Sequence, residues 1–255
     1  MIRLTIAPEP PTFQKEVREP GENVLALLAG QPPPHRCSPQ SIDKTTTTKA
    51  KSKTKAKASQ PNVKQTIEDY PYWRKCLDEL HEAYGGICAY YCYYVHKASL
   101  PHIDHFIAKK DAATAQAYEW KNYRLASGYA NTCKNRFPDV LDPAAIEDGW
   151  FQIEDFVSLQ VRANPELPEV AQKAVLAAIN RLKLNTGRAF EVRQRGMLAF
   201  RAGTPIDWLQ HDHPFLAKEL RRQGITTKEQ LPAYPPAITC IEELELPAKA
   251  TVKVG

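Results

Sequence analysis

An aspartate and a histidine stand side by side near the middle of the chain, at Asp104 and His105. Carboxylate oxygens are ligands that Mg²⁺ prefers, and a neutral imidazole with a pKa of about 6.5 can take a proton from water at neutral pH. The apolar neighbours Ile103 and Phe106 are typical of a strand, on which adjacent side chains point to opposite faces. The two residues can therefore serve one site only if the strand ends or bends there. Otherwise they are a surface histidine beside a surface aspartate.

Three further polar residues follow this pair at a defined spacing. Asn122 lies 17 residues after His105, and Asn131 lies nine residues after Asn122. Lys134 comes three residues later. Asp-His pairs alone occur often by chance, so the functional interpretation depends on this spacing.

The spacing resembles that of HNH nucleases, in which D-H is followed by N, by N or H nine residues later, and then by K. The resemblance covers residues 87–143, about a fifth of the chain. It implies an α+β fold with a small ββα-metal core, in which two strands and a helix surround one divalent metal ion. In this chain the HNH core would be embedded in a mainly helical domain with extended Pro-rich termini.

Carried over residue by residue, the resemblance gives each matching position a role. Asp104 and Asn131 would hold the metal, Mg²⁺ or Mn²⁺, because a hard cation that keeps several waters needs few protein oxygens. The catalytic residues would be His105 as the general base and Asn122 as a brace of the loop through backbone hydrogen bonds. Three basic residues could contact the substrate phosphate or be ordinary surface groups: His102, Arg124 and Lys134.

The cysteines depart from the common HNH pattern, in which two CxxC pairs hold a structural zinc ion. Ser127 and Ala130 stand where the second pair would be, and Cys88 and Cys92 are separated by one residue too many. This spacing does not favour a structural zinc. Buried thiols are the favoured interpretation, and metal binding by Cys88 and Cys92 is left open.

Several segments resemble a narrower branch, the HNH proteins of Septu-type bacterial anti-phage defence systems. In that family the nuclease is encoded beside an ABC/SMC-like ATPase and assembles with it. The resemblance therefore implies an ATPase partner and a role in antiviral defence. The segments that carry it are residues 2–11, 17–21, 87–90, 104–106, 117–125 and 139–143.

The elements that position these residues are predicted from periodicity and from helix-breaking residues. Apolar residues recur every three or four positions before Gly85 and Gly86, which predicts a helix that begins at Pro71 and ends at the glycines. Two strands, a short helix and three longer helices are predicted to follow, at residues 87–95, 102–106, 131–135, 170–182, 190–200 and 208–222. The chain beyond Pro143 is thus predicted to be mostly helical.

The composition, with 43% hydrophobic and 25% charged residues, is that of a soluble globular protein. Seven lysines with no acid among them lie between Lys44 and Lys64, which predicts a flexible basic linker. The predicted division is an extended N-terminal arm at 1–43, the linker at 44–62, the HNH core with its preceding helix at 63–145, a helical domain at 146–230 and an extended tail at 231–255.

The net charge of +5 permits nucleic-acid binding. No apolar run approaches the roughly 20 residues of a membrane span, and the first residues do not read as a signal peptide. We therefore expect a cytoplasmic protein with no membrane partner.

The leading hypothesis is a metal-dependent HNH endonuclease that hydrolyses phosphodiester bonds in DNA, as the effector of a bacterial anti-phage complex with an ATPase. One alternative is an HNH-like adaptor with weak or no activity that binds nucleic acid. The missing zinc ligands and the basic linker favour this alternative. Another is an RNA-directed nuclease, because a one-metal site neither requires nor excludes a 2′-hydroxyl group.

Overall fold

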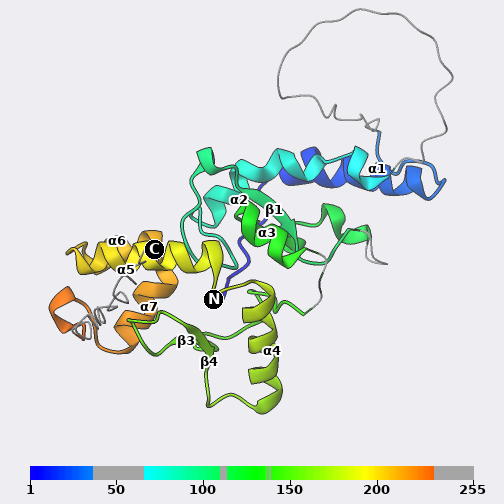
Figure 1. The fold of residues 1–255 in the computed structure, drawn as a ribbon. Helices are drawn as coiled ribbons and strands as arrows, with labels where there is room; N and C mark the ends of the chain where they lie inside the picture. Colours follow the sequence, from blue (N-terminus) through cyan, green and yellow to red (C-terminus); the bar gives the residue numbers. More distant parts are fainter. Residues whose placement is uncertain (37–65, 110–113, 136, 138, 233–255) are drawn as a thin grey trace, which may run out of the picture.

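The computed structural model describes residues 1–36, 66–109, 114–135, 137 and 139–232, which form a mixed α+β fold of helices and small antiparallel sheets (Figure 1). The predicted linker, residues 44–62, lies outside the described residues, as do all but the first two residues of the predicted tail. Within the described part of the chain, no helix is long and apolar enough to cross a membrane.

The N-terminal arm is helical over much of its described length. A π-helical segment, Gln14–Arg18, leads into helix α1, Glu19–Leu28. The expectation of an extended arm is wrong for these residues. Val17 and Val24 are fully buried, seven residues apart on one helix face. Pro20 follows the π-helical segment without a break, and because it has no N–H this position donates no helical hydrogen bond to that segment.

The helix before the hairpin begins as a tighter 3₁₀ segment, Tyr72–Cys76, and continues as α2, Leu77–Ala83. The glycine pair ends the helix as predicted. Gly85 and Gly86 have φ angles of +56° and +72°, which glycine adopts without strain. A Cβ at Gly86 would lie 2.4 Å from the ring of Tyr94, so close packing also requires glycine there.

The first sheet is a hairpin that carries the Asp-His pair. β1, His102–His105, pairs antiparallel with β2, Tyr123–Ala126. The register places Asp104 directly opposite Arg124. The strand predicted at residues 102–106 is confirmed within one residue.

Helix α3, Gly128–Lys134, follows β2 directly and starts earlier than the predicted helix at 131–135. Ser127 precedes it, and the Ser127 hydroxyl accepts a hydrogen bond from the Ala130 N–H at 3.3 Å. This N-cap satisfies one of the amide groups that a helix start leaves without a partner. Ser127 therefore serves as a helix cap.

Residues 87–95 do not form the predicted strand. The segment folds back in a turn, with one isolated bridge between Ile87 and Tyr94. The Cys92 N–H donates to the Cys88 carbonyl at 2.8 Å, and Cys92 has a φ of +53°, outside the extended region. The apolar content that indicated a strand serves instead to bury a loop.

The second half of the chain is mostly helical, as predicted, but it begins with a hairpin that was not predicted. β3, Phe151–Ile153, pairs antiparallel with β4, Val161–Ala163. The predicted helix at 208–222 is divided in two, because Pro214 lacks the N–H that would continue the first part. The helices are α4, Glu169–Arg181, α5, Gly187–Arg201, α6, Ile206–Asp212, and α7, Pro214–Arg222. Further 3₁₀ segments are Ile67–Asp69, Lys97–Ser99, Thr114–Tyr118, Trp120–Asn122 and Lys228–Gln230.

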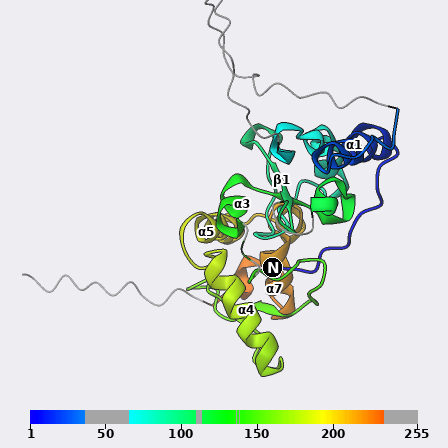
Figure 2. The same ribbon diagram turned by 90° about the vertical axis from the view of Figure 1, so that its right-hand side faces the viewer.

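Two clusters of buried side chains meet at β2. The first is largely aromatic and packs the N-terminal arm and the α2 region against the hairpin. The second is largely aliphatic and joins the loop at 88–95 to β3, β4 and the helices from α4 to α7. Leu125 belongs to the first cluster and Ala126 to the second, because neighbours on a strand face opposite sides. The hairpin accordingly lies between α1 and α2 on one side and the later helices on the other, and Figure 2 shows the same division from a second direction.

Candidate active site

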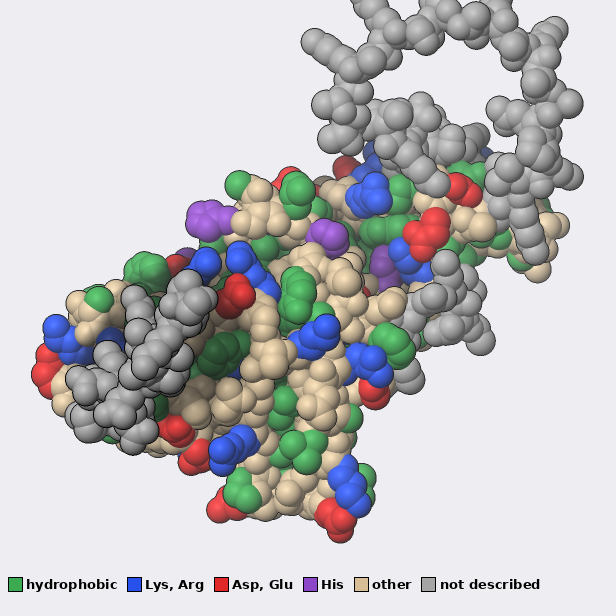
Figure 3. Space-filling view, in the orientation of Figure 1, with side chains coloured by type: hydrophobic (Ala, Val, Ile, Leu, Met, Phe, Trp, Pro, Cys, Tyr) green, Lys and Arg blue, Asp and Glu red, His purple; other side chains and the backbone are tan. Residues whose placement is uncertain are grey.

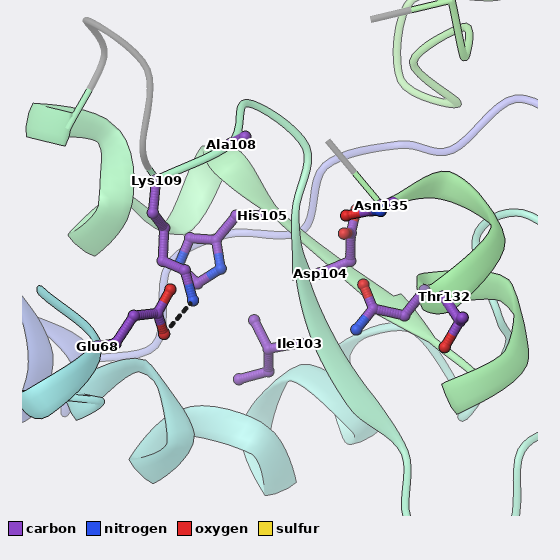
Figure 4. Close-up of a pocket in the computed structure, with 9 residues that line it drawn as sticks. Glu68, Ile103, Asp104, His105, Ala108, Lys109, Thr132 and Asn135 are labelled. Carbon is purple, nitrogen blue, oxygen red and sulfur yellow. Dashed lines mark hydrogen bonds and ion pairs between the residues drawn. The ribbon is translucent and has the colours of Figure 1, made fainter. Parts of the chain in front are cut away.

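A cavity of about 510 Å³ lies between β1, the turn after it and α3. Figure 4 shows Glu68, His105 and Lys109 on one side of it, with Thr132 and Asn135 on the other. Asp104 and His105 both reach the cavity because β1 ends at His105, which is the condition under which adjacent strand residues can share a site. The cavity is lined by Glu68, Ile103, Asp104, His105, Ala108, Lys109, Asn131, Thr132 and Asn135.

His105 is buried, with 7% of its surface exposed. Its Nε2 lies 2.9 Å from the carbonyl oxygen of Ala117. Because a carbonyl oxygen can only accept, Nε2 carries the proton and Nδ1 carries the lone pair. Trp73 and Tyr123 pack edge-on against the imidazole, each with 5.0 Å between ring centroids. Burial, and after it the charge of Lys109, lowers the pKa of His105 to about 3, so the imidazole is neutral at neutral pH.

Asp104 is 4% exposed and is bonded on both carboxylate oxygens. The Tyr90 hydroxyl donates to Oδ2. Lys134 Nζ lies 3.2 Å from Oδ1 and 3.0 Å from Oδ2. Burial raises the pKa of Asp104, while the charge of Lys134 and the bond from Tyr90 oppose the rise. The carboxylate therefore forms a buried ion pair at the edge of the cavity.

Asn131 reaches the cavity from α3. Its Nδ2 lies 3.3 Å from Nδ1 of His102. The amide nitrogen is the donor of this bond, so the amide oxygen is not used by it and can face a ligand. His102 is exposed and does not line the cavity. The structure thus places His102 as a contact of Asn131, with no direct position in the site.

Asn122 lies outside the cavity and holds the surrounding loop. Its Oδ1 accepts from the Ile107 N–H at 2.8 Å. Its Nδ2 donates to the carbonyl oxygens of Ile107 at 3.1 Å and of Gln116 at 3.0 Å. These bonds tie the segment after β1 to the segment that enters β2. They are bonds to the backbone, the type expected of Asn122 from the sequence.

Arg124 and Lys134 are not available to a substrate phosphate, contrary to the expectation from the sequence. Arg124 is 2% exposed, and its Nε and Nη2 donate to the two carboxylate oxygens of Asp142 at 2.9 and 2.7 Å. Its Nη1 donates to two backbone carbonyls. Lys134 is 1% exposed. Besides Asp104, its Nζ donates to the backbone carbonyls of His105 at 2.6 Å and of Phe106 at 2.8 Å. An ammonium group has three donors, so all of them are used.

Cys88 and Cys92 are buried thiols. Burial raises the pKa of both, which keeps them protonated at neutral pH. The Cys88 Sγ accepts a hydrogen bond from the Ser127 N–H at 3.4 Å. In the described residues, no three His, Cys, Asp or Glu side chains are grouped so that they could hold a metal ion. A Mg²⁺ site with one carboxylate and one amide ligand does not need such a group.

Four residues around the cavity were not predicted as site residues: Glu68, Trp73, Tyr90 and Lys109. Tyr90 lies in the segment at 87–90, from which the sequence predicted a strand and no site residue. Glu68 and Lys109 are 41 residues apart in the chain and meet only in the fold. No local spacing could indicate their pairing.

The cavity brings together a neutral imidazole, a carboxylate and an amide oxygen. These groups can accept a proton from water and bind a hard cation. Comparisons of this chain with family models, with curated proteins and with solved structures found no match.

Proposed function

We propose that this chain is a metal-dependent endonuclease of the HNH type that hydrolyses phosphodiester bonds in DNA, with its active site in the cavity between β1 and α3. The observation that carries the proposal is the state of His105. It is a buried, neutral imidazole whose Nε2 proton is held by the Ala117 carbonyl, so that Nδ1 is left as the base. Asp104 and Asn131, the other main residues of the motif, line the same cavity.

His105 would activate the attacking water molecule. Nδ1 takes a proton from the water as its oxygen forms a bond to phosphorus and the P–O bond to the leaving oxygen breaks. The Ala117 carbonyl stabilises the imidazolium that forms, through the Nε2–H bond. A bound phosphodiester brings negative charge near the ring and raises the pKa of His105 from its low value, toward the range in which proton transfer is efficient.

Asp104 and Asn131 fit a hard divalent cation such as Mg²⁺ or Mn²⁺. Both residues line the same cavity and carry oxygen atoms, and such a cation keeps several waters, so few protein ligands suffice. When bound, the ion supplies charge stabilisation at the phosphate and at the leaving oxygen. Tyr90 and Lys134 orient the Asp104 carboxylate by hydrogen bonds, as supporting residues do around metal ligands.

The substrate and the partner are proposed from charge and from the resemblance. The net charge of +5 suits a polyanionic substrate. The resemblance to Septu-type HNH proteins favours DNA as the substrate and an ABC/SMC-like ATPase as the partner. On the same ground we propose a cytoplasmic role in bacterial antiviral defence.

A second function is favoured by the ion pair of Asp104 and Lys134. The ammonium group already neutralises the carboxylate that would bind a metal ion, and an entering cation has to compete with it. If this pair persists, the cavity binds a phosphodiester without cutting it. The protein then acts as a nucleic-acid-binding adaptor.

Nicking of supercoiled plasmid in the presence of Mg²⁺ or Mn²⁺ and of the ATPase partner tests the proposal. The wild type should convert the plasmid to open circles, and His105→Ala should lose at least about 10²-fold in rate. His81→Ala is a matched control, because His81 is also buried and its Nε2 bonds a backbone carbonyl, that of Val95, at 2.8 Å.

Three outcomes separate the functions. Equal cleavage by the wild type and by His105→Ala would exclude this cavity as the active site. Binding of DNA without cleavage at any metal concentration would favour the adaptor. Cleavage of labelled RNA but not of labelled DNA in parallel digestions would make RNA the substrate.

A further inference from the structure

A charged pair, Glu68 and Lys109, lies on the side of the cavity opposite α3. Lys109 Nζ lies 3.2 Å from Oε2 of Glu68 and 4.0 Å from the centroid of the Trp73 ring. Figure 4 shows Glu68 and Lys109 joined next to the His105 ring. The Lys109 side chain is 18% exposed and that of Glu68 is 41% exposed, so the cation is the more enclosed partner.

Lys109 is the basic side chain that this cavity offers to an anion. Among the described lining residues, Glu68 and Asp104 are acids, His105 is neutral, and Lys109 carries the positive charge. Burial lowers the pKa of Lys109, and Glu68 opposes this effect. The ammonium group has three donors, and Glu68 takes one of them. A ligand oxygen can therefore bond to the same nitrogen.

Among the described residues that line the cavity, no other side chain carries a positive charge. Arg124 and Lys134 use their donors inside the protein. On the face drawn in Figure 3, basic and acidic side chains of the described residues are interspersed, with no continuous basic patch. Within the described lining, Lys109 therefore provides the positive charge that attracts a phosphate.

We propose that Lys109 binds a phosphate of the nucleic-acid ligand and that Glu68 is the carboxylate with which this phosphate competes for the ammonium group. The inference rests on the proposed function only for the class of ligand. Glu68 and Trp73 hold Lys109 in place while no ligand is bound. A phosphate oxygen then becomes an acceptor of Lys109, and the Glu68 carboxylate lowers the affinity by repulsion of like charges.

Binding of a single phosphodiester in EDTA tests this proposal, because it requires no cleavage. Dithymidine monophosphate is titrated into the full chain, and the ¹⁵N–¹H signal of the Trp73 indole, assigned with Trp73→Phe, reports occupancy of the cavity. Lys109→Gln should weaken the affinity on the order of 10-fold, and Lys109→Arg should stay within about threefold of wild type. Glu68→Gln should tighten binding by roughly threefold or more.

Two controls isolate the charge of Lys109. Glu169 and Lys173 form an exposed acid–base pair on α4, with 2.6 Å between Oε1 and Nζ, and neither lines the cavity. Glu169→Gln and Lys173→Gln should leave the affinity unchanged. The neutral methylphosphonate analogue of the dinucleotide should bind equally to wild type and to Lys109→Gln, because it has no charge for Lys109 to attract.

Three results would overturn the inference. The first is the absence of a titratable Trp73 signal in the wild type, and the second is equal affinity in wild type, Lys109→Gln and Glu68→Gln. The third is weaker binding in Glu68→Gln, which would make Glu68 a support of the phosphate site. If plasmid cleavage depends on His105 but Lys109→Gln does not change the affinity for the dinucleotide, only this inference is contradicted. A protein that does not cleave but loses affinity in Lys109→Gln contradicts only the nuclease.

Discussion

Two acid–base pairs each have one buried residue on the β1–β2 hairpin, Asp104 or Arg124, and the surroundings of the two pairs differ. Asp104 and Arg124 stand directly opposite each other in the register, yet each pairs elsewhere. Asp104 pairs with Lys134 of α3, with 3.0 Å between Oδ2 and Nζ. Arg124 pairs with Asp142 beyond α3, with 2.7 Å between Nη2 and Oδ2. Only the first pair borders the cavity that also holds His105.

The geometry of the two pairs explains what each can do. The Arg124 guanidinium makes two parallel bonds to Asp142 and two bonds from Nη1 to backbone carbonyls, so four of its five N–H donors are bonded inside the protein. The Lys134 ammonium is a compact point charge, with which a divalent cation can compete for a carboxylate. A bidentate pair is suited to fixing the fold, and a point-charge pair beside His105 is suited to exchange with a ligand.

The largest expected effect is on plasmid cleavage, when the aspartate of each pair is changed to asparagine. Asp104→Asn should reduce metal-dependent plasmid cleavage by at least about 10³-fold, because an amide in this position loses the charge that attracts the cation. Asp142→Asn should stay within about 10-fold of wild type once its folding is verified, because Asp142 does not line the cavity. Initial nicking rates at saturating Mg²⁺ provide the measurement. Equal losses in the two variants would mean that the pairs do not differ in function.

Removal of the basic partner should cost stability in both pairs. Lys134→Met leaves the buried Asp104 carboxylate without its counter-ion, which costs about 3–5 kcal/mol in free energy of unfolding. Arg124→Met does the same to the half-buried Asp142 carboxylate. The loss should be larger for Lys134→Met, because the Asp104 side chain is 5% exposed and that of Asp142 is 19% exposed, so Asp142 can regain more hydration. Urea unfolding followed by circular dichroism gives both values. A smaller loss in Lys134→Met would contradict this ranking.

The sequence predicted the parts of the site that depend on local spacing. The strand at 102–106 and the glycine stop after α2 follow from patterns within a few residues, and the structure has both. Asp104, His105 and Asn131 were expected to share a site, and they line one cavity. The metal and the reaction assigned to them stay predictions.

The remaining features depend on contacts between distant segments. Glu68 meets Lys109 only through the packing of the first cluster around β2. The loop at 87–95 has the composition of a strand but turns back at Cys92, and its neighbours bury it as a loop. Arg124 was read as a possible phosphate contact because nothing near it in the chain indicates Asp142, 18 residues later, as its partner. Tertiary contacts determine these positions, and local periodicity does not record them.

The pH dependence of stability should reveal the buried imidazole. The pKa of His105 is about 3 in the folded chain and about 6.5 when unfolded, so the unfolded state binds more protons between these values. The contribution of His105 to the free energy of unfolding is fully present above pH 6.5 and is lost as the pH falls toward 3. From pH 7 to pH 5 the wild type should lose about 2 kcal/mol through this group.

The free energy of unfolding of His105→Asn, measured over the same pH range, provides the comparison with wild type. His213 also has a pKa lowered by burial, and it contributes in the same direction in both proteins. The difference in slope between wild type and His105→Asn therefore belongs to His105. Parallel slopes from pH 7 to pH 5 would show that His105 is not held neutral by the fold.

The smallest expected effect is thermal stabilisation by the metal ion itself. With a Kd on the order of 1 mM, 10 mM Mg²⁺ would add about 1.4 kcal/mol and raise the Tm by about 3 °C. This shift should disappear in Asp104→Asn and Asn131→Ala, which remove the two proposed ligands, and persist in Asp142→Asn. Differential scanning fluorimetry with and without Mg²⁺ at constant ionic strength measures it. A shift that is equal in Asp104→Asn and Asp142→Asn would place the cation elsewhere, and the exchange with Lys134 that distinguishes the two pairs would then have no support.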